Sequence, residues 1–232
     1  MPSLSYQERC GELRTYFDRT AVEAWSRLTS DAPVSRIRAT VRAGRDQMRR
    51  TLLDWLPADL KGRRLLDAGC GTGALAVEAA RRGADVVAID VAPTLIELAR
   101  ERAPDDLGSG SVLFLVGDMS EDLGRFDHVV AMDSLIHYRS RDVVTLLAGV
   151  AARTTGSILF TYAPRTPALT LMHAVGRLFP RRDRAPAIEP VGSDSLERQI
   201  LGEPGLRDWR VGRTARIACG FYTSQALELR RP

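Results

Sequence analysis

The sequence has 232 residues, of which 44% are hydrophobic and 27% charged, and this is typical of one sizeable globular domain with a small extension. It contains neither an apolar run of about 18 residues, the length that a membrane-spanning helix needs, nor a basic and apolar leader, so we expect a cytoplasmic protein. The net charge of +4 is not gathered in a segment with interleaved aromatic residues, which argues against a nucleic-acid-binding surface.

The first part of the chain, residues 1–60, shows apolar residues at helical spacing and no strand pattern. Leu13 and Phe17 lie on one face of a first predicted helix. Ser35 is a candidate N-cap of a longer helix that Pro57 ends. We therefore predict an N-terminal helical cap over residues 1–60.

From residue 61 to residue 232 the pattern alternates strand and helix, which predicts a parallel sheet with helices on both faces. Two further strand-like segments close together near the C-terminus predict an antiparallel hairpin. The predicted strands cover residues 64–67, 85–90, 112–116, 128–132, 157–162, 209–218 and 221–229, and the helices between them cover 73–82, 93–103 and 141–152. The expected fold is a Rossmann-like α/β domain with a seven-stranded, mostly parallel sheet.

Residues 163–192 interrupt this order as an insert. Apolar residues at helical spacing predict a helix over residues 166–179. A surface element packed on the core is the first interpretation of this insert. A lid over a ligand or an amphipathic helix that touches a membrane are the alternatives.

A glycine turn follows the first predicted strand, in Asp67-Ala68-Gly69-Cys70-Gly71-Thr72-Gly73. Glycine lets the backbone approach a ligand, and the N-terminus of the following helix favours a carboxylate there. Asp67 is placed to attract an ammonium group. This layout resembles the S-adenosylmethionine site of class I methyltransferases, which implies methyl transfer.

The same glycines also fit the dinucleotide pattern, with Ala74 in its last position, so a nicotinamide-dependent oxidoreductase is an alternative. Asp67 would lie badly beside a pyrophosphate. Gly117-Asp118-Met119 resembles the adenine-binding position of class I methyltransferases, and the terminal hairpin completes their seven-stranded sheet. These features favour S-adenosylmethionine.

Asp90 ends the second predicted strand, where its carboxylate can accept hydrogen bonds from both ribose hydroxyls. Asp118 would accept from the adenine amino group, with Met119 near the ring. The three cysteines lack paired or metal-ligand spacing, so we expect no protein-bound metal. The predicted cofactor-binding residues are Asp67, Gly69, Cys70, Gly71, Gly73, Asp90, Val91, Asp118, Met119, Asp133 and Arg42.

The acceptor is indicated by the segment Asp133-Ser134-Leu135-Ile136-His137-Tyr138 after the fourth strand. It lacks an Asn-Pro-Pro-Tyr-like tetrapeptide, which disfavours methylation of nucleic-acid bases. Many small-molecule methyltransferases carry a histidine here. His137 is therefore a candidate catalytic residue beside the transferred methyl group.

Several further motifs are distributed over nearly the full length of the chain. They are Tyr16-Phe17-Asp18 with Trp25, Ile37-Arg38, Val41-Arg42-Ala43-Gly44-Arg45, the glycine turn, Met132-Asp133-Ser134-Leu135-Ile136-His137-Tyr138 and Phe160-Thr161-Tyr162-Ala163-Pro164. On these motifs the chain resembles the magnesium-protoporphyrin O-methyltransferase family of chlorophyll and bacteriochlorophyll synthesis. That family tends to have asparagine where Asp18 stands and histidine where Arg45 stands, and these departures concern local contacts.

This resemblance implies that the acceptor is magnesium protoporphyrin IX and that Tyr16 and His137 lie near the transfer site. It also implies the large subunit of magnesium chelatase as a partner, and peripheral contact with photosynthetic membranes. Arg42, Arg38 or an arginine of residues 177–184 would pair with the second propionate, because the planar guanidinium suits a carboxylate.

A propionate with a pKa of about 4–5 is already ionised at neutral pH, so methyl transfer needs no general base. His137 and Tyr16 would then position the carboxylate, or His137 would contact the porphyrin magnesium axially. Proton removal is the least needed role. The alternatives are a methyltransferase for a quinone or phenolic acceptor, with His137 as base, and a non-catalytic porphyrin carrier.

Overall fold

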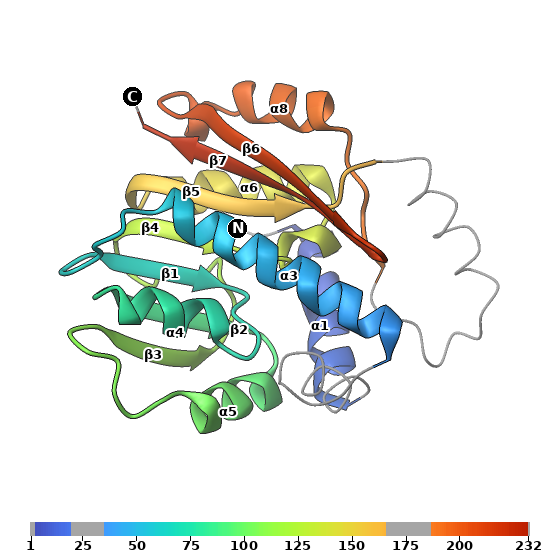
Figure 1. Cartoon of the computed structure of the whole chain (residues 1–232). Coiled ribbons are helices and arrows are strands. Elements are labelled where there is room, and N and C mark those ends of the chain that lie inside the picture. The colour runs from blue at the N-terminus through green and yellow to red at the C-terminus, as the bar shows by residue number, and fades with distance from the viewer. Residues whose placement is uncertain (1–2, 20–34, 166–186, 232) are drawn as a thin grey trace.

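The computed structural model describes residues 3–19, 35–165 and 187–231. Within them lies a seven-stranded sheet with the order β3-β2-β1-β4-β5-β7-β6 (Figure 1). The strands are β1 Arg64–Ala68, β2 Asp85–Asp90, β3 Ser111–Val116, β4 Phe126–Ala131, β5 Thr154–Tyr162, β6 Arg210–Cys219 and β7 Tyr222–Arg230. Strands β1 to β5 run parallel, and β7 is antiparallel to both β5 and β6. The predicted fold and its terminal hairpin are confirmed.

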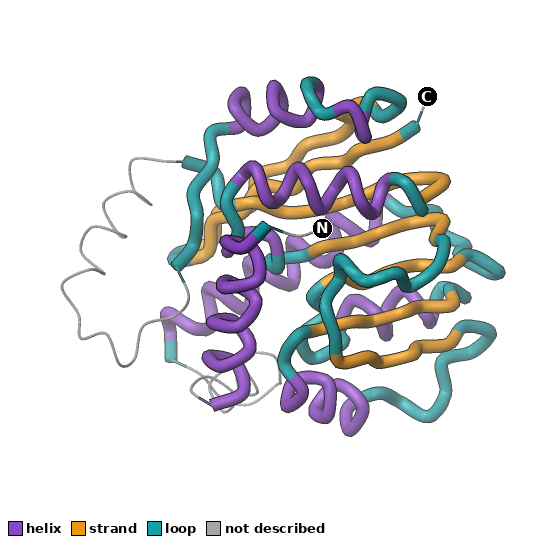
Figure 2. The backbone as a smooth tube through the Cα atoms, turned by 180° about the vertical axis from the view of Figure 1, so that it is seen from behind, coloured by secondary structure: helices purple, strands orange, loops and turns teal. Residues whose placement is uncertain are grey.

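Helices cover both faces of this sheet, α3 and α4 on one side and α6 and α8 on the other (Figures 1 and 2). The helices are α1 Leu4–Arg19, α3 Arg36–Trp55, α4 Ala74–Arg81, α5 Pro93–Arg102, α6 Ser140–Ala151 and α8 Ser193–Leu201, with the short 3-10 helices η1 Leu135–His137 and η3 Pro204–Leu206. In the described ranges, no helix combines the length and the apolar character needed to cross a membrane.

Helix α3 begins and ends where the sequence predicts. The Oγ of Ser35 accepts a hydrogen bond from the backbone N–H of Arg38 at 3.4 Å, which satisfies one unpaired donor of the first turn. Leu56 has an extended backbone because the proline ring of Pro57 clashes with a helical residue before it. Met48 and Leu52, four residues apart in α3, are fully buried on the face of the helix that packs on the sheet.

The hydrophobic core consists of two clusters, one on each face of the sheet. Leu65 belongs to the cluster under α3 and α4, whereas its neighbour Leu66 packs with Phe126 and Phe160 on the other face. This division follows from the strand geometry, in which successive side chains point to opposite faces.

Two parts of the predicted organisation stay predictions. The helix predicted over residues 166–179 lies outside the described residues, as does most of the lid-like insert 163–192. The division into a cap over residues 1–60 and a core over 61–232 stays a prediction.

Helix α8 was not predicted. Its buried residues, Leu196 and Ile200, form a single pair at helical spacing, which is too short a pattern to identify a helix.

The carboxyl ends of β1 to β4 bring several predicted site residues to one edge of the sheet. Ala68 pairs with Ile89, and Asp90 pairs with Val116, so the segments that follow β1, β2 and β3 lie side by side. Helix α1 lies across the ends toward which these strands point (Figures 1 and 2). The space between this edge of the sheet and α1 is therefore the candidate position of the functional site.

Candidate active site

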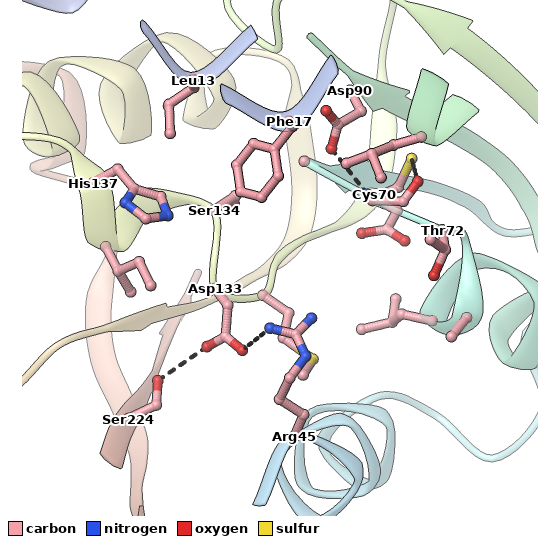
Figure 3. A pocket seen from close by; sticks show the side chains of 18 of the residues that line it. Leu13, Phe17, Arg45, Cys70, Thr72, Asp90, Asp133, Ser134, His137 and Ser224 are labelled. Atoms are coloured by element: carbon pink, nitrogen blue, oxygen red, sulfur yellow. Dashed lines mark hydrogen bonds and ion pairs between the residues drawn. The ribbon is translucent and has the colours of Figure 1, made fainter. Parts of the chain in front are cut away.

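A cavity of about 490 Å³ lies at the carboxyl edge of the sheet. Its walls come from α1, α3, the turn after β1, the segments after β2 to β4, and the β6–β7 hairpin. Figure 3 shows His137 and Asp90 on opposite sides of this pocket with Phe17 between them. One end is therefore formed by the glycine turn and the other by η1.

Most of the predicted site residues line this cavity. The predicted residues in its wall are Tyr16, Arg42, Asp67, Gly69, Cys70, Gly71, Asp90, Val91, Met119, Asp133 and His137. Gly73 and Asp118 are not in the wall, and neither is Arg38, which is exposed. The lining shows which residues the fold brings together, and their individual roles stay predictions.

The turn after β1 needs its glycines for two reasons. Gly69, Gly71 and Gly73 have φ values of 80°, 56° and 77°, a left-handed conformation that side chains rarely adopt. In addition, a Cβ on Gly69 would collide with Ser134, and one on Gly73 would collide with the ring of Phe114. Gly73 thus shapes the turn and packs against Phe114 without contributing to the pocket wall.

Asp67 is a buried carboxylate with an unsatisfied acceptor. The side chain is 1% exposed, and its Oδ2 has no hydrogen-bond partner among the described residues. Burial, together with the nearby charge of Asp90, raises the pKa of Asp67 to about 7. A buried acceptor of this kind in a pocket wall suits a cationic ligand group, because an unmade hydrogen bond to a charged group is costly.

Asp90 connects the glycine turn to the next segment. Its Oδ2 accepts from the backbone N–H of Gly71 at 2.9 Å, and its Oδ1 accepts from the N–H of Ala92 at 3.0 Å. Burial raises its pKa. Each carboxylate oxygen can accept a second hydrogen bond, so the group can hold the turn and still bind two ligand hydroxyls.

The carboxylate of Asp118 faces helix α1 instead of the cavity. It accepts from the hydroxyl of Tyr6 at 2.6 Å, from the thiol of Cys10 at 3.4 Å and from the backbone N–H of Ser120 at 2.7 Å. Tyr6 also stacks on Tyr138, with ring centroids 4.8 Å apart. Asp118 therefore connects α1 to the segment after β3. No local sequence pattern predicts this contact.

Replacement of Tyr6 by phenylalanine is expected to destabilise α1 by about 1–3 kcal/mol, because a charge-assisted hydrogen bond to a part-buried carboxylate is lost. Hydrogen exchange of the α1 amides measures this directly. Tyr16→Phe is the matched control, because the Tyr16 hydroxyl has no hydrogen bond to a described residue. Equal exchange in the wild type and Tyr6→Phe would show that the contact does not hold α1.

Asp133 joins three elements at the pocket wall. Its carboxylate accepts from Arg45 Nη1 at 2.6 Å, from the Tyr222 hydroxyl at 3.0 Å, and from the hydroxyls of Ser224 and Thr161 at 3.2 Å each. The backbone of Asp133 has a φ of 54°, the only positive value among the described non-glycine residues. These contacts tie α3, β5 and β7 to the end of β4. Arg45, Tyr222 and Ser224 were not predicted as site residues.

The opposite end of the cavity is aromatic. Phe17 packs edge-on against Tyr16 and His137, with ring centroids 5.2 Å and 6.5 Å away. Burial lowers the pKa of His137 to about 4, so its ring is neutral at physiological pH. Its Nδ1 lies 3.3 Å from the carbonyl oxygen of Ala187, and a carbonyl only accepts, so Nδ1 carries the proton. Nε2 is left with a lone pair.

Comparisons with known proteins agree with this geometry. Residues 131–231 match the family model "Magnesium-protoporphyrin IX methyltransferase C-terminus", and residues 65–155 match "Methyltransferase domain". The magnesium-protoporphyrin O-methyltransferase of Rhodobacter capsulatus is 50% identical over 99% of this chain and 100% of its own length.

A solved structure and a more distant relative complete the comparison. Magnesium protoporphyrin IX methyltransferase from Synechocystis PCC 6803, solved with bound SAH, superposes with a TM-score of 0.83 at 27% identity, covering 96% of this chain and 99% of its own. A ubiquinone biosynthesis O-methyltransferase from Xanthomonas oryzae is 35% identical, but over only 56% of this chain and 58% of its own.

The sheet order, with β7 antiparallel between β5 and β6, the glycine turn after β1 and the acidic residue that ends β2 together define a class I methyltransferase fold. Within that class, the match to the Rhodobacter capsulatus enzyme over the full length of both chains identifies the family. The chain belongs to the magnesium-protoporphyrin O-methyltransferase family.

Proposed function

We infer that the chain transfers the methyl group of S-adenosylmethionine to a propionate carboxylate of magnesium protoporphyrin IX, giving its monomethyl ester in (bacterio)chlorophyll biosynthesis. The observation that carries this inference is a single cavity with the buried carboxylates of Asp67 and Asp90 at one end and the aromatic group around His137 at the other.

The residues at the glycine turn fit the cofactor. The unsatisfied Oδ2 of Asp67 suits its ammonium group, and Asp90 suits the ribose hydroxyls. A pyrophosphate would bring further negative charge against the buried carboxylate of Asp67, which disfavours a nicotinamide cofactor. When bound, S-adenosylmethionine supplies an electrophilic methyl group on a positively charged sulfur.

Cofactor affinity is expected to fall as the pH drops below about 7. The pKa of Asp67 in the free protein is about 7, and only the ionised carboxylate attracts an ammonium group, so protonation must be reversed on binding. Calorimetry of S-adenosylmethionine binding between pH 5.5 and 8 measures the effect, with Asp67→Asn as the control that removes it. Equal affinity across this range would contradict the assignment.

The acceptor end needs to position a carboxylate and exclude water. A propionate is ionised above a pKa of about 4–5, so no base is needed to create the nucleophile. The Tyr16 hydroxyl donates to one carboxylate oxygen. The Nε2 atom of the neutral His137 ring carries no proton and cannot donate to a carboxylate, whereas its lone pair suits contact with the porphyrin magnesium.

The turnover number is expected to be flat between pH 6 and 8, because His137, with a pKa of about 4, stays neutral throughout this range and the propionate stays ionised. A phenolic acceptor would need proton removal, and its rate would rise through the titration of a base. Single-turnover rates with saturating cofactor test this point. A step near pH 6.5 that disappears in His137→Gln would favour the phenol alternative.

Incubation with methyl-labelled S-adenosylmethionine and magnesium protoporphyrin IX, followed by mass analysis of the pigment, tests the function. We expect one labelled methyl ester per macrocycle. The dimethyl ester of the same pigment, which has no free carboxylate, should accept none. Labelling of the dimethyl ester, or labelling of a phenolic acid in place of the pigment, would contradict the proposal.

The proposed partner is the large subunit of magnesium chelatase, and the proposed location is the surface of photosynthetic membranes. The family's position in pigment synthesis supports both, because the acceptor is a magnesium-loaded, largely apolar macrocycle that is best passed on without release to water. Co-sedimentation with the purified subunit and with vesicles tests each separately.

A further inference from the structure

The cavity is too small to enclose both the cofactor and the macrocycle. Its volume of about 490 Å³ lies within the range of about 300–1,000 Å³ that holds one small molecule. A nucleoside attached to an amino acid is already a ligand of this size, and a macrocycle of four pyrrole rings is a second one. Since the reacting carboxylate ends a short flexible arm, it can enter while the ring stays at the mouth.

Phe221 is an exposed aromatic side chain in the wall of this cavity. Large hydrophobic side chains are exposed at six places in the described part of the chain, and Phe221, 58% exposed, is the one among them that lines the cavity. Isolated exposed hydrophobic residues are normal on a surface, but an aromatic residue in the wall of a ligand pocket marks a binding contact.

The hairpin that carries Phe221 is held firmly against α3. Gly220 has a φ of 57°, and a Cβ on it would collide with Thr40 of α3. On the other side of Phe221, the Tyr222 ring packs so closely on α3 that a Cβ on Gly44 would lie 2.5 Å from its Cδ1. Phe221 is therefore presented by a well-fixed turn.

Helix α3, against which the hairpin packs, also carries apolar residues near the cavity. Val41 lines the cavity, and Ile37, one turn earlier on the same helix face, is 53% exposed. Thr40, between them in sequence, is the residue against which Gly220 packs. Phe221 and Val41 thus both line the cavity, and Ile37 adds an exposed apolar side chain one turn beyond Val41.

We propose that Phe221 receives a face of the macrocycle at the pocket mouth and thereby sets the affinity for the acceptor. This assignment rests on the proposed function, because it takes the acceptor to be a flat aromatic ring. Ring stacking adds to the burial of apolar area, and neither effect changes between the ground state and the transition state of a distant methyl transfer. Phe221 is thus a specificity residue that acts on KM and leaves kcat unaltered.

Fluorescence titration of magnesium protoporphyrin IX in the presence of S-adenosylhomocysteine tests the proposal. For Phe221→Ala we expect the Kd of the macrocycle to rise about 10-fold, while Phe221→Tyr, which keeps the ring, stays close to the wild type. Leu201→Ala removes another exposed hydrophobic side chain, 70% exposed and outside the cavity wall, and should change nothing. Unchanged calorimetric affinity for S-adenosylhomocysteine confirms that each variant is folded.

A Kd and a KM that remain unchanged in Phe221→Ala, while the wild type binds the macrocycle, would overturn the role of Phe221 and leave the proposed function standing. A fall in kcat at constant KM would also overturn it. Failure of the wild-type protein to bind or methylate the macrocycle would instead refute the proposed function itself.

Discussion

Replacement of His137 by alanine is expected to lower the turnover number by about 10- to 1000-fold, on the scale of other orienting and acid–base groups. The affinity for S-adenosylmethionine should be nearly unchanged, because His137 lies on the side of the pocket opposite Asp90 (Figure 3). Turnover with magnesium protoporphyrin IX and calorimetry with the cofactor measure the two quantities separately.

The matched control for His137→Ala is His128→Ala. His128 is the other histidine among the described residues, bonds to the Ser157 hydroxyl at 2.8 Å and does not line the cavity. Metal-free protoporphyrin as the acceptor distinguishes contact with the magnesium from positioning of the propionate. If Nε2 contacts the magnesium, His137→Ala should lower the turnover number less with this acceptor than with magnesium protoporphyrin IX. Full turnover in a folded His137→Ala variant would remove this residue from the site.

Replacement of Asp90 by alanine is expected to weaken S-adenosylmethionine binding by about 100-fold or more, because two hydrogen bonds to an ionised group are each worth about 1.5–3 kcal/mol. The turn after β1 also loses an acceptor, since Asp90 holds the N–H of Gly71. Calorimetry gives the affinity directly. Native affinity in Asp90→Ala would contradict the ribose assignment.

Two control variants test whether the effect of Asp90→Ala is specific to the position of this carboxylate. Asp90→Asn keeps one side-chain oxygen as an acceptor and should weaken binding less than Asp90→Ala. Asp85→Ala removes an exposed carboxylate from the other end of the same strand, at a distance from the cavity wall. An equal loss of affinity in Asp85→Ala would indicate a general effect of charge on β2.

The glycine turn and the acidic residues near the carboxyl ends of the strands could be predicted from sequence because their chemistry is local. Gly69 and Gly71 mark a left-handed turn, and the end of each buried strand places the next polar residue at the same edge of the sheet. The ends of α3 could be predicted for equally local reasons. Ser35 caps its first turn, and Pro57 disfavours a helical conformation of the residue before it.

The contacts that tie the pocket together could not be predicted in this way, because they join distant parts of the chain. The place of Asp118 after β3 predicts a contact with the adenine ring, but nothing near it in the sequence predicts that its carboxylate bonds to Tyr6, 112 residues away. Tyr222 and Ser224 reach Asp133 only because β7 inserts beside β5. Pairing between strands that are distant in sequence produces no periodic pattern around Asp133, Tyr222 or Ser224, so the sequence does not predict these contacts.

A crystal structure of the protein with S-adenosylhomocysteine and magnesium protoporphyrin IX would test the proposed active site directly. We expect the ribose on Asp90, the ammonium group on Asp67, one propionate oxygen of the macrocycle pointing at the sulfur beside the Tyr16 hydroxyl, and the magnesium facing Nε2 of His137. A nucleoside bound away from these carboxylates, or a macrocycle with both propionates directed into solvent, would contradict the proposed active site.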